Sequence, residues 1–489
     1  MPLRAAKKYN ARVLRAIETA RASRGIARYR APEFVYHTSR VKILIRGGTL
    51  VHCDGAGTVA EGDLLVDGDR IAALGQVPEP ILDGRDGLVR VLDATGCAVI
   101  PGFVQGHVHL CQVLFRGMAD DLPLLVWLET RIWPYEAAHD EASLAASAEL
   151  GLLEMMLAGT TTILDMGTVH AYDAVFDACD RAGIRVFGGK TMMDAGKGVP
   201  KGLRETTASS LAESDRLRDT WSGKGNGRLA YAYAPRFILS CTEELFRGTV
   251  ERANDRARSD RALLHSHVAE HPDERVAVRE VLGDDDISML RKWGFKGKNT
   301  LLAHGVQLTD EEIDAVAADG TRIVHCPSAN LKLGSGIARV HELARRGVQL
   351  ALGADGAPCN NNLDPWVELR HAALLAKVRT GVTTLPARQA LELATIEGAR
   401  ALGIDDEVGS LEVGKRADLV VVRMDGPHVE PGGDAFSRLA YGCTSKDVVH
   451  VMVDGQLVVR NGEHTRLDRD EVLSRARAQA KKLVARAKT

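Results

Sequence analysis

Eight short apolar segments alternate with helix-like segments along the middle of this chain of 489 residues. The apolar segments cover residues 98–104, 161–164, 184–187, 229–234, 262–264, 300–303, 321–324 and 349–352. Helical patterns fill most of the intervals, as in 143–158 and 272–282. Strands that alternate with helices in this way are typical of a (β/α)8 TIM barrel, which we therefore predict. A doubly wound open sheet is the alternative, but no GxGxxG turn follows the first strand.

Both ends of the chain carry a different pattern, in which short alternating apolar stretches are separated by Gly-Gly and Asp-Gly steps that favour hairpin turns. These stretches fall in residues 41–98 and 405–465. A small composite β-sandwich domain built from both chain ends would explain why they flank the alternating part. We therefore expect the barrel to span residues 99–404, with a helical extension over 1–40 and a C-terminal helix over 466–489.

The composition is that of a soluble globular protein, with 45% hydrophobic residues, 26% charged residues and a formal net charge of −2. This near balance gives no support for a nucleic-acid or membrane partner, and no uninterrupted apolar run is long enough to span a bilayer. The eight cysteines are scattered without a CxxC pair, so we expect reduced thiols and a cytoplasmic protein. The expected partner is a small molecule, and the N-terminal extension could serve self-association into a homo-oligomer.

Polar side chains stand at the C-terminal end of nearly every predicted strand. They are His107, His109, Asp165, Lys190, Arg236, His267, His304, His325 and Asp355. A single histidine at a strand end is more often a structural residue. In a barrel, however, the strand ends converge on one face, where active sites lie. Imidazoles and carboxylates at most of the eight ends therefore predict a catalytic site on that face.

Part of this set matches a site for one divalent metal. His107 and His109 are two positions apart, and side chains at this spacing share one side of a strand. His267 would add a third nitrogen and Asp355 a carboxylate oxygen, which leaves a place for a water molecule. A bound divalent metal lowers the pKa of such a water towards ~7. We expect zinc, although the same ligands accept iron.

Three residues are placed to move protons. Asp355 can accept the proton of the water, and Glu270, which follows His267, is suited to carry a proton to a ring nitrogen and a leaving group. His304 could hydrogen-bond the attacking hydroxide. A second metal would usually need a bridging group such as a carboxylated lysine on the fourth strand, but the chain has Arg236 at the end of that strand.

Several motifs resemble the amidohydrolase superfamily, in its single-metal aminohydrolase (deaminase) branch. They are PGFVQGHVHL, HSHVAEH, LLAHG, HCPSANLKLGSG, GADGAPCNNNLD and GSLEVGKRADLVVV. The resemblance implies a distorted barrel with a composite β domain, and a hydroxide on zinc or iron that attacks a ring carbon and releases ammonia. It also implies that the metal ligands are His107, His109, His267 and Asp355, and that the proton-moving residues are Glu270, His304 and Asp355.

Within this branch, one set of features resembles the guanine deaminases. The segments GKTMMD and APRFILSC and the residue Gln112 carry this resemblance. It implies that Gln112 and Arg236 hydrogen-bond the purine while Phe237 packs against it. Trp127 is a further candidate for stacking on the ring, and His304 for contacting it. These features favour a guanine-like oxo-purine, a pterin or a related ring.

Other segments resemble the methylthioadenosine/S-adenosylhomocysteine deaminases. They are FRGMADDLPLLVWLETRIWP, HCPSANLKLGSG and GADGAPCNNNLDPWVELRHAALLAK. That group usually has Gly-Pro-His on the fourth strand, where this chain has Ala234-Pro235-Arg236. We rank the guanine-like substrate first, with an adenosine-type substrate and triazine amino- or chlorohydrolysis as alternatives. If Arg236 paired with Asp165 or Asp194, the guanine argument would fail. A metal-free scaffold relative is the alternative from another class, but the complete ligand set counts against it.

Overall fold

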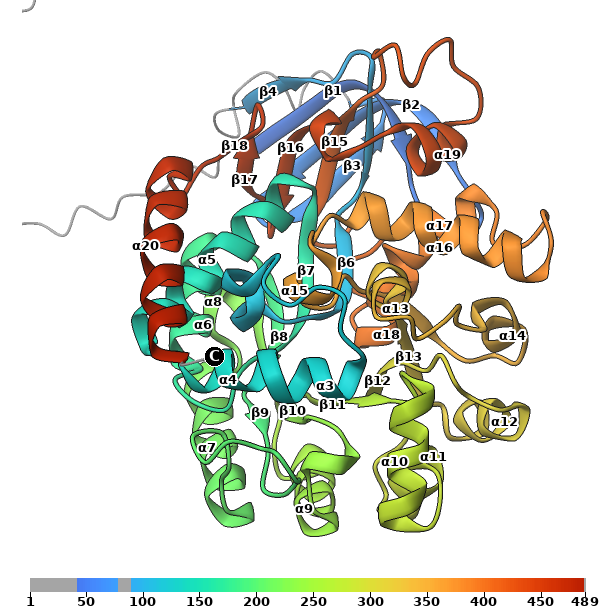
Figure 1. The fold of residues 1–489 in the computed structure, drawn as a ribbon. Coiled ribbons are helices and arrows are strands. Elements are labelled where there is room, and N and C mark those ends of the chain that lie inside the picture. Colours follow the sequence, from blue (N-terminus) through green and yellow to red (C-terminus); the bar gives the residue numbers. More distant parts are fainter. Residues whose placement is uncertain (1–41, 78–88, 488–489) are drawn as a thin grey trace, which may run out of the picture. The chain divides into compact units, whose positions relative to one another are not determined.

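A computed structural model describes residues 42–77 and 89–487 of the chain (Figure 1). Within this part, eight parallel strands follow one another from β11 round to β10, and β10 also pairs with β11, so that the sheet closes into a barrel. The barrel strands are β6 (Phe103–Val108), β7 (Thr160–Met166), β8 (Arg185–Gly189), β10 (Leu229–Pro235), β11 (Ala262–Val268), β12 (Thr300–His304), β13 (Arg322–His325) and β14 (Leu350–Leu352). The predicted (β/α)8 barrel is confirmed.

Helices separate the barrel strands. After β6 come η1 (Leu110–Phe115), α3 (Leu124–Trp127), η2 (Leu128–Ile132), α4 (Trp133–Ala137) and α5 (Glu141–Leu157). Between β7 and β14 lie α6 (Asp173–Ala182), the short strand β9 (Thr191–Met192), α7 (Thr207–Trp221), α8 (Lys224–Gly227), α9 (Glu243–Ala253), α10 (Pro272–Leu282), α11 (Asp286–Lys292), α12 (Asp310–Asp319), α13 (Pro327–Lys332) and α14 (Val340–Arg345). After β14 come α15 (Ala357–Asn360), α16 (Pro365–Thr380), α17 (Ala387–Leu393) and α18 (Ile396–Leu402).

Local sequence signals set the ends of these helices. At the start of α12, the Thr309 side chain accepts a hydrogen bond from the Glu312 backbone N–H, and the Glu312 side chain accepts one from the Thr309 backbone N–H. This capping box satisfies two N–H groups that the first turn leaves without partners. The same helix ends at Gly320, which has a φ of 71°, a left-handed conformation that glycine adopts without a Cβ clash.

The second sheet combines strands from before and after the barrel in the chain. Its strands are β1 (Lys42–Val51), β2 (Val59–Asp67), β3 (Arg70–Gly75), β4 (Val89–Asp93), β5 (Cys97–Pro101), β15 (Leu419–Arg423), β16 (Val448–Val453), β17 (Gln456–Arg460) and β18 (Glu463–His464). The antiparallel pairing of β5 with β15 joins the two parts. The predicted composite β domain is therefore confirmed, while the domain limits given above remain predictions.

A single glycine separates the two sheets at the end of β5. Gly102 stands between β5 and β6, and a Cβ at this position would lie 2.1 Å from Thr161 Oγ1. No larger residue fits without a shift of β7, so the glycine allows the chain to pass directly from the composite domain into the first barrel strand.

The C-terminal helix α20 (Arg469–Ala487) packs on α5, where Arg475 lies 3.0 Å from the buried carboxylate of Glu149. The short α19 (Ala435–Ser437) precedes it in the chain. The predicted N-terminal extension 1–40 lies outside the described residues. None of the helices in the described part combines the length and apolar character needed to cross a membrane.

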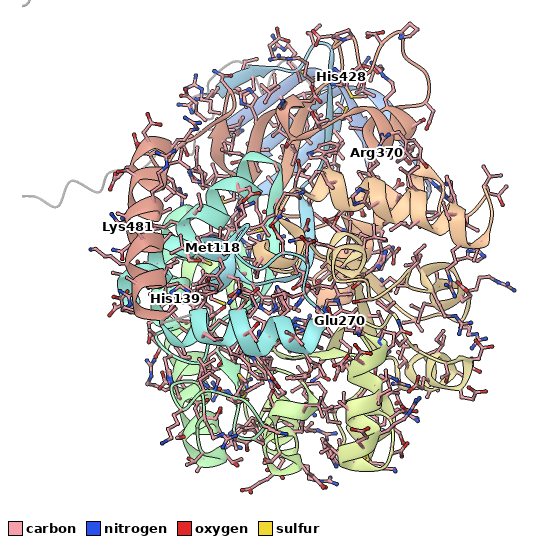
Figure 2. The ribbon with its side chains drawn as sticks, in the orientation of Figure 1. Met118, His139, Glu270, Arg370, His428 and Lys481 are labelled. Carbon is pink, nitrogen blue, oxygen red and sulfur yellow. The ribbon has the colours of Figure 1, made fainter. Side chains whose placement is uncertain are left out.

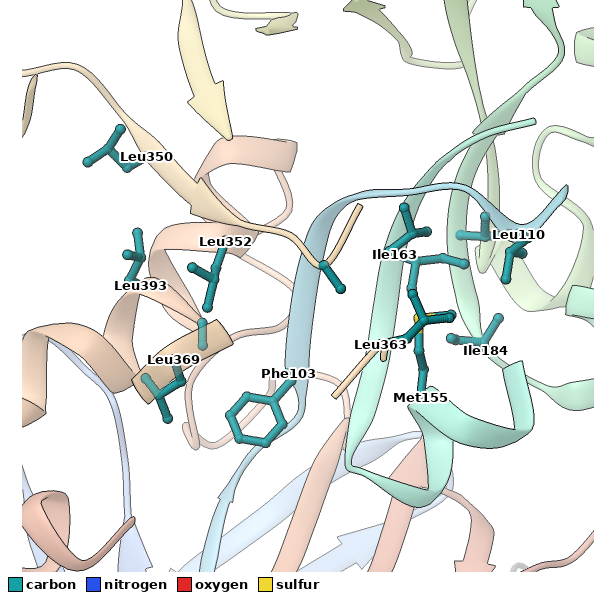
Figure 3. Close-up of a cluster of buried hydrophobic side chains, with 14 of the residues drawn as sticks. Phe103, Leu110, Met155, Ile163, Ile184, Leu350, Leu352, Leu363, Leu369 and Leu393 are labelled. Carbon is teal, nitrogen blue, oxygen red and sulfur yellow. The ribbon is translucent and has the colours of Figure 1, made fainter. Parts of the chain in front are cut away.

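The two faces of the barrel strands contribute to different apolar clusters. One cluster takes one residue from each strand, namely Val104, Leu164, Phe187, Ala232, Leu263, Leu301, Val324 and Ala351. The neighbouring residues Phe103, Ile163 and Leu352 belong to a second cluster, which also includes residues of the surrounding helices (Figure 3). Because strand side chains alternate, the first cluster fills the barrel and the second packs the helices on it. The rigid barrel therefore fixes the positions of the strand ends.

Candidate active site

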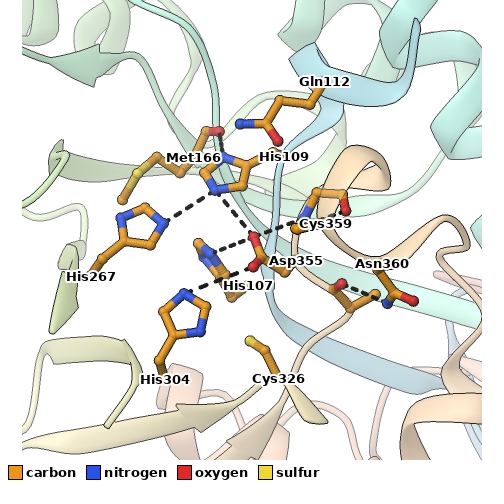
Figure 4. A network of polar contacts seen from close by, with 12 residues as sticks. His107, His109, Gln112, Met166, His267, His304, Cys326, Asp355, Cys359 and Asn360 are labelled. Carbon is orange, nitrogen blue, oxygen red and sulfur yellow. Dashed lines mark hydrogen bonds and ion pairs between the residues drawn. The ribbon is translucent and has the colours of Figure 1, made fainter. Parts of the chain in front are cut away.

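Four predicted ligand residues meet at the C-terminal ends of the barrel strands (Figure 4). His107 lies in β6, His109 directly follows it, His267 lies in β11 and Asp355 follows β14. One side-chain N or O atom from each lies within 4.8 Å of the others. The Nε2 atoms of His107 and His109 are 3.2 and 3.4 Å from Asp355 Oδ1.

Irregular backbone aims these side chains. The pairing of β6 with β7 shifts in register between Gln105 and Val108, and such a bulge re-aims the residues that follow it. Asp355 has a φ of 63°, which is uncommon for a residue other than glycine. Its backbone N–H donates a 3.0 Å hydrogen bond to the His107 carbonyl, which ties the two ligand segments together.

Hydrogen bonds to backbone carbonyls fix which ring nitrogen of two histidines carries the proton. His109 Nδ1 lies 2.7 Å from the Met166 carbonyl, and His267 Nδ1 lies 2.7 Å from the Arg236 carbonyl. A carbonyl only accepts, so each Nδ1 must donate. Burial lowers the pKa of His109 to about 3 and that of His267 well below its usual value, so both rings are neutral near pH 7. Each Nε2 therefore carries a lone pair.

These lone pairs face one another. His109 Nε2 and His267 Nε2 are 3.2 Å apart, which is hydrogen-bonding distance, yet neither atom has a proton to share. His107 Nε2 is buried without a hydrogen-bond partner, and Asp355 adds a carboxylate oxygen. Acceptors that converge without a donor are stabilised by a cation. Three imidazole nitrogens and one carboxylate oxygen form a set that zinc and iron both accept, so the residues fit a divalent metal.

Glu270 and His304 lie beside this cluster. His304 Nε2 is 3.5 Å from Glu270 Oε2 and 3.8 Å from Asp355 Oδ2. Burial and the nearby Asp355 carboxylate raise the pKa of Glu270 well above its usual value. Glu270 lies near α3 and α10 (Figure 2), and its backbone N–H donates to the Glu274 carboxylate at 2.8 Å. The site thus has a carboxyl group poised to hold a proton next to the ligand cluster.

The predicted site residues lie around one pocket, apart from His107, which does not line it. Its lining includes His109, Gln112, Trp127, Arg236, Phe237, His267, Glu270, His304 and Asp355, with Leu124, Leu128, Glu274 and Leu333 completing the wall. The apolar members come mainly from α3 and η2, and most polar members from the strand ends, except Gln112 in η1 and Glu274 in α10. This combination of apolar walls and a few convergent polar groups is typical of a small-molecule site.

Arg236 has a buried partner that the sequence motifs do not indicate. Its Nη1 lies 2.6 Å from Glu136 Oε2, and Gln112 Nε2 donates to Glu136 Oε1 at 2.9 Å. Arg236 and Glu136 are each 2% exposed. Arg236 therefore pairs with neither Asp165 nor Asp194, which form other hydrogen bonds. Gln112 Oε1 remains buried without a partner. The guanidinium charge is thus balanced within the protein before any substrate binds.

We expect Arg236→Ala to lower the free energy of unfolding by ~3–5 kcal/mol, because it leaves the Glu136 carboxylate buried and unpaired. Urea denaturation of the metal-free protein measures this loss. The double variant Arg236→Ala/Glu136→Ala is the matched control and should recover a large part of it. A loss below ~1 kcal/mol in the single variant would contradict a tight buried pair.

Three residues that contact predicted site residues were not identified from the sequence. No sequence pattern indicated a role for Glu136 in the site, apart from its place after the Trp133-Pro134 pair. His265 shares a strand face with His267 in HSHVAEH, and its Nε2 lies 2.7 Å from His107 Nδ1. Asn330, in HCPSAN, has its Oδ1 2.9 Å from His304 Nδ1. The same-face spacing of His265 could have been read from the motif, but its contact with β6 could not.

Two other groups at the strand ends have structural contacts. Lys190 Nζ forms a buried salt bridge with Glu205 Oε2 at 2.6 Å. Asp165 accepts 2.7 Å hydrogen bonds from the Leu110 backbone N–H and the Tyr172 hydroxyl. The eight cysteines are all free.

Comparison with known proteins matches the amidohydrolase family over residues 98–458. The chain is 38% identical to a 5-methylthioadenosine/S-adenosylhomocysteine deaminase of Halobacterium salinarum, covering 91% of this chain and 98% of the relative. It is 36% identical to a 5′-deoxyadenosine deaminase of Methanosarcina acetivorans, covering 91% and 99%. Among solved structures, a zinc-bound adenosine deaminase from Xanthomonas campestris gives a TM-score of 0.82 at 30% identity, covering 91% and 98%. Escherichia coli guanine deaminase gives 0.74 at 28% identity, covering 86% and 99%. Since these matches extend along nearly the whole of each relative, the chain belongs to the amidohydrolase family.

Proposed function

We propose that the protein is a metal-dependent hydrolytic deaminase that acts on an adenosine-type nucleoside. The observation that carries this proposal is the convergence of four acceptor groups beside Glu270 in a small-molecule pocket. The deaminase names of the relatives support the reaction class. Both curated relatives described above act, by name, on adenosine derivatives that differ at the 5′ position.

His107, His109, His267 and Asp355 would hold the metal, and we expect zinc because a zinc-bound protein is among the similar structures. When bound, such a metal lowers the pKa of water and supplies hydroxide near neutral pH. Hydrolysis then replaces a C–NH2 bond with a C=O bond and releases ammonia, so protons must move from the water to the ring nitrogen and to the leaving amine.

The protein supplies groups for these proton transfers. Asp355 Oδ2, which faces His304, can accept the proton of the water. Glu270 is suited to carry a proton to the ring nitrogen and the amine, because a raised pKa lets its carboxyl group donate near neutral pH. His304 is held by Asn330 with its Nε2 towards both carboxylates and can orient the attacking oxygen. Trp127 and Phe237 are placed in the wall to pack against the ring.

The ranking of substrates changes from the sequence-based one. The guanine-like substrate ranked first because Arg236 and Gln112 could read an oxo-purine. Arg236 is instead paired with Glu136, and the curated relatives are adenosine-type deaminases. A guanine-like ring remains the second candidate. Gln112 lines the pocket with Arg236 and Phe237, and its Oε1 is a buried acceptor without a hydrogen-bond partner. The cytoplasmic location, the homo-oligomer and the absence of a nucleic-acid partner remain predictions.

A screen for ammonia release distinguishes these substrates. We expect the zinc-loaded protein to deaminate 5′-deoxyadenosine or methylthioadenosine with a kcat/KM at least tenfold above that for guanine, a pterin or an aminotriazine. The Glu270→Gln variant, purified in parallel, controls for a contaminating deaminase. Faster turnover of guanine than of every adenosine derivative would overturn the proposed substrate class while leaving the reaction type intact.

A further inference from the structure

His265 is a fully buried histidine that has no part in the proposed reaction. It lies on β11 two residues before His267 and does not line the pocket, so it cannot touch a substrate there. Its two ring nitrogens have different neighbours. Nδ1 lies 3.0 Å from the Leu301 carbonyl on β12, and Nε2 lies 2.7 Å from His107 Nδ1 on β6. His265, on β11, therefore contacts β12 through Nδ1 and the proposed metal ligand His107 through Nε2.

The Leu301 carbonyl determines which ring nitrogen carries the proton in His265 and, through it, in His107. The Leu301 carbonyl cannot donate, so His265 Nδ1 must carry a proton. A neutral imidazole has only one N–H proton, which makes His265 Nε2 an acceptor. His107 Nδ1 must then be the donor in the 2.7 Å contact, and His107 Nε2 keeps its lone pair. This is the atom that faces Asp355 and has no hydrogen-bond partner.

His107 differs in this respect from the other two histidines of the cluster. His109 and His267 donate to backbone carbonyls, which no substitution at the acceptor can remove. His107 depends on a side chain. We propose that His265 is a positioning residue that fixes the tautomer and ring orientation of His107 for metal binding. This inference rests on the ligand set proposed above but not on the identity of the substrate.

Metal affinity tests the proposal without reference to activity. The protein is stripped of metal, and the zinc dissociation constant is measured by competition with a chromophoric chelator. His265→Leu removes the acceptor but keeps an apolar side chain of similar bulk, and we expect zinc to bind it about 10–100-fold more weakly. His265→Gln can accept from His107 through its carbonyl and donate to Leu301 through its amide nitrogen, so its affinity should lie within threefold of the parent.

A matched control separates positioning from loss of packing. His325 is also a buried barrel histidine, on β13, and its Nδ1 has no hydrogen-bond partner. His325→Leu should therefore bind zinc as tightly as the parent, and the thermal midpoints of the metal-free variants show whether each one folds. The proposal is overturned if His265→Leu loses less than tenfold, if His265→Gln is as weak as His265→Leu, or if His325→Leu shows the same loss. If the parent itself binds no zinc, the proposed ligand set fails as well.

Discussion

Replacing Glu270 with glutamine is expected to lower kcat by about 10²–10⁴-fold, the range that a positioned acid or base contributes. Glutamine preserves the size of the side chain but cannot deliver a carboxyl proton. Glu270 is 5% exposed and lies 3.5 Å from His304, in a setting that raises its pKa well above the usual value. Its loss therefore removes the group best placed to donate a proton near neutral pH. Steady-state assays on the preferred nucleoside measure the effect.

Metal content must be measured on the same samples, because a lost metal would also abolish turnover. We expect the Glu270→Gln variant to keep as much zinc as the parent, since the four ligand residues do not include Glu270. Glu274→Gln is the matched control, because Glu274 is a buried glutamate in the same pocket whose oxygen accepts from the Glu270 backbone. It should lose far less activity than Glu270→Gln. Equal losses in the two variants, or a kcat for Glu270→Gln within tenfold of the parent, would remove Glu270 from the reaction.

The barrel and the ligand cluster could be predicted because both depend on regular patterns. Alternating segments imply the strand order, and a closed barrel brings residues at strand ends together wherever they stand in the sequence. His107 and His267 are 160 residues apart in the chain, but each stands at the end of a recognisable strand. Even the bulge in β6 did not disturb this prediction, because it re-aims His107 and His109 together.

The partners of the site residues could not be predicted in the same way. Glu136 comes from α4, a helix outside the strand-and-helix repeat, and its pairing with Arg236 depends on how that insertion folds over the barrel mouth. The preference for a guanine-like substrate rested on a free Arg236, and the pairing of Arg236 with Glu136 removes its main physical support. The contact of His265 with His107 likewise crosses the barrel and depends on the register of strands that are far apart in sequence.

Removing the metal should abolish deamination, and one equivalent of zinc per chain should restore it. A catalytic metal contributes several kcal/mol to transition-state stabilisation, so its removal should lower the rate about 10³-fold or more. The expected stoichiometry is one, because His107, His109, His267 and Asp355 form one set of four ligand atoms, and the neighbouring group of Glu270, His304 and Asp355 has only three and shares Asp355 with it. At the end of β10, where a bridging lysine would be needed for a second metal, Arg236 is held by Glu136. Activity measured during titration of the stripped protein gives the stoichiometry directly.

The same titration has a thermodynamic readout. Zinc that binds only the folded protein stabilises it by about 2.7 kcal/mol when free zinc is 100 times the dissociation constant, so the thermal midpoint should rise sharply once zinc exceeds one equivalent. His267→Leu is the matched variant, since it removes one nitrogen from β11 and leaves His107 and His109 in place. It should show neither the sharp rise nor the recovery of activity at one equivalent. A requirement for two equivalents would refute the single-metal site, and full activity in the stripped protein would refute the metal-dependent reaction altogether.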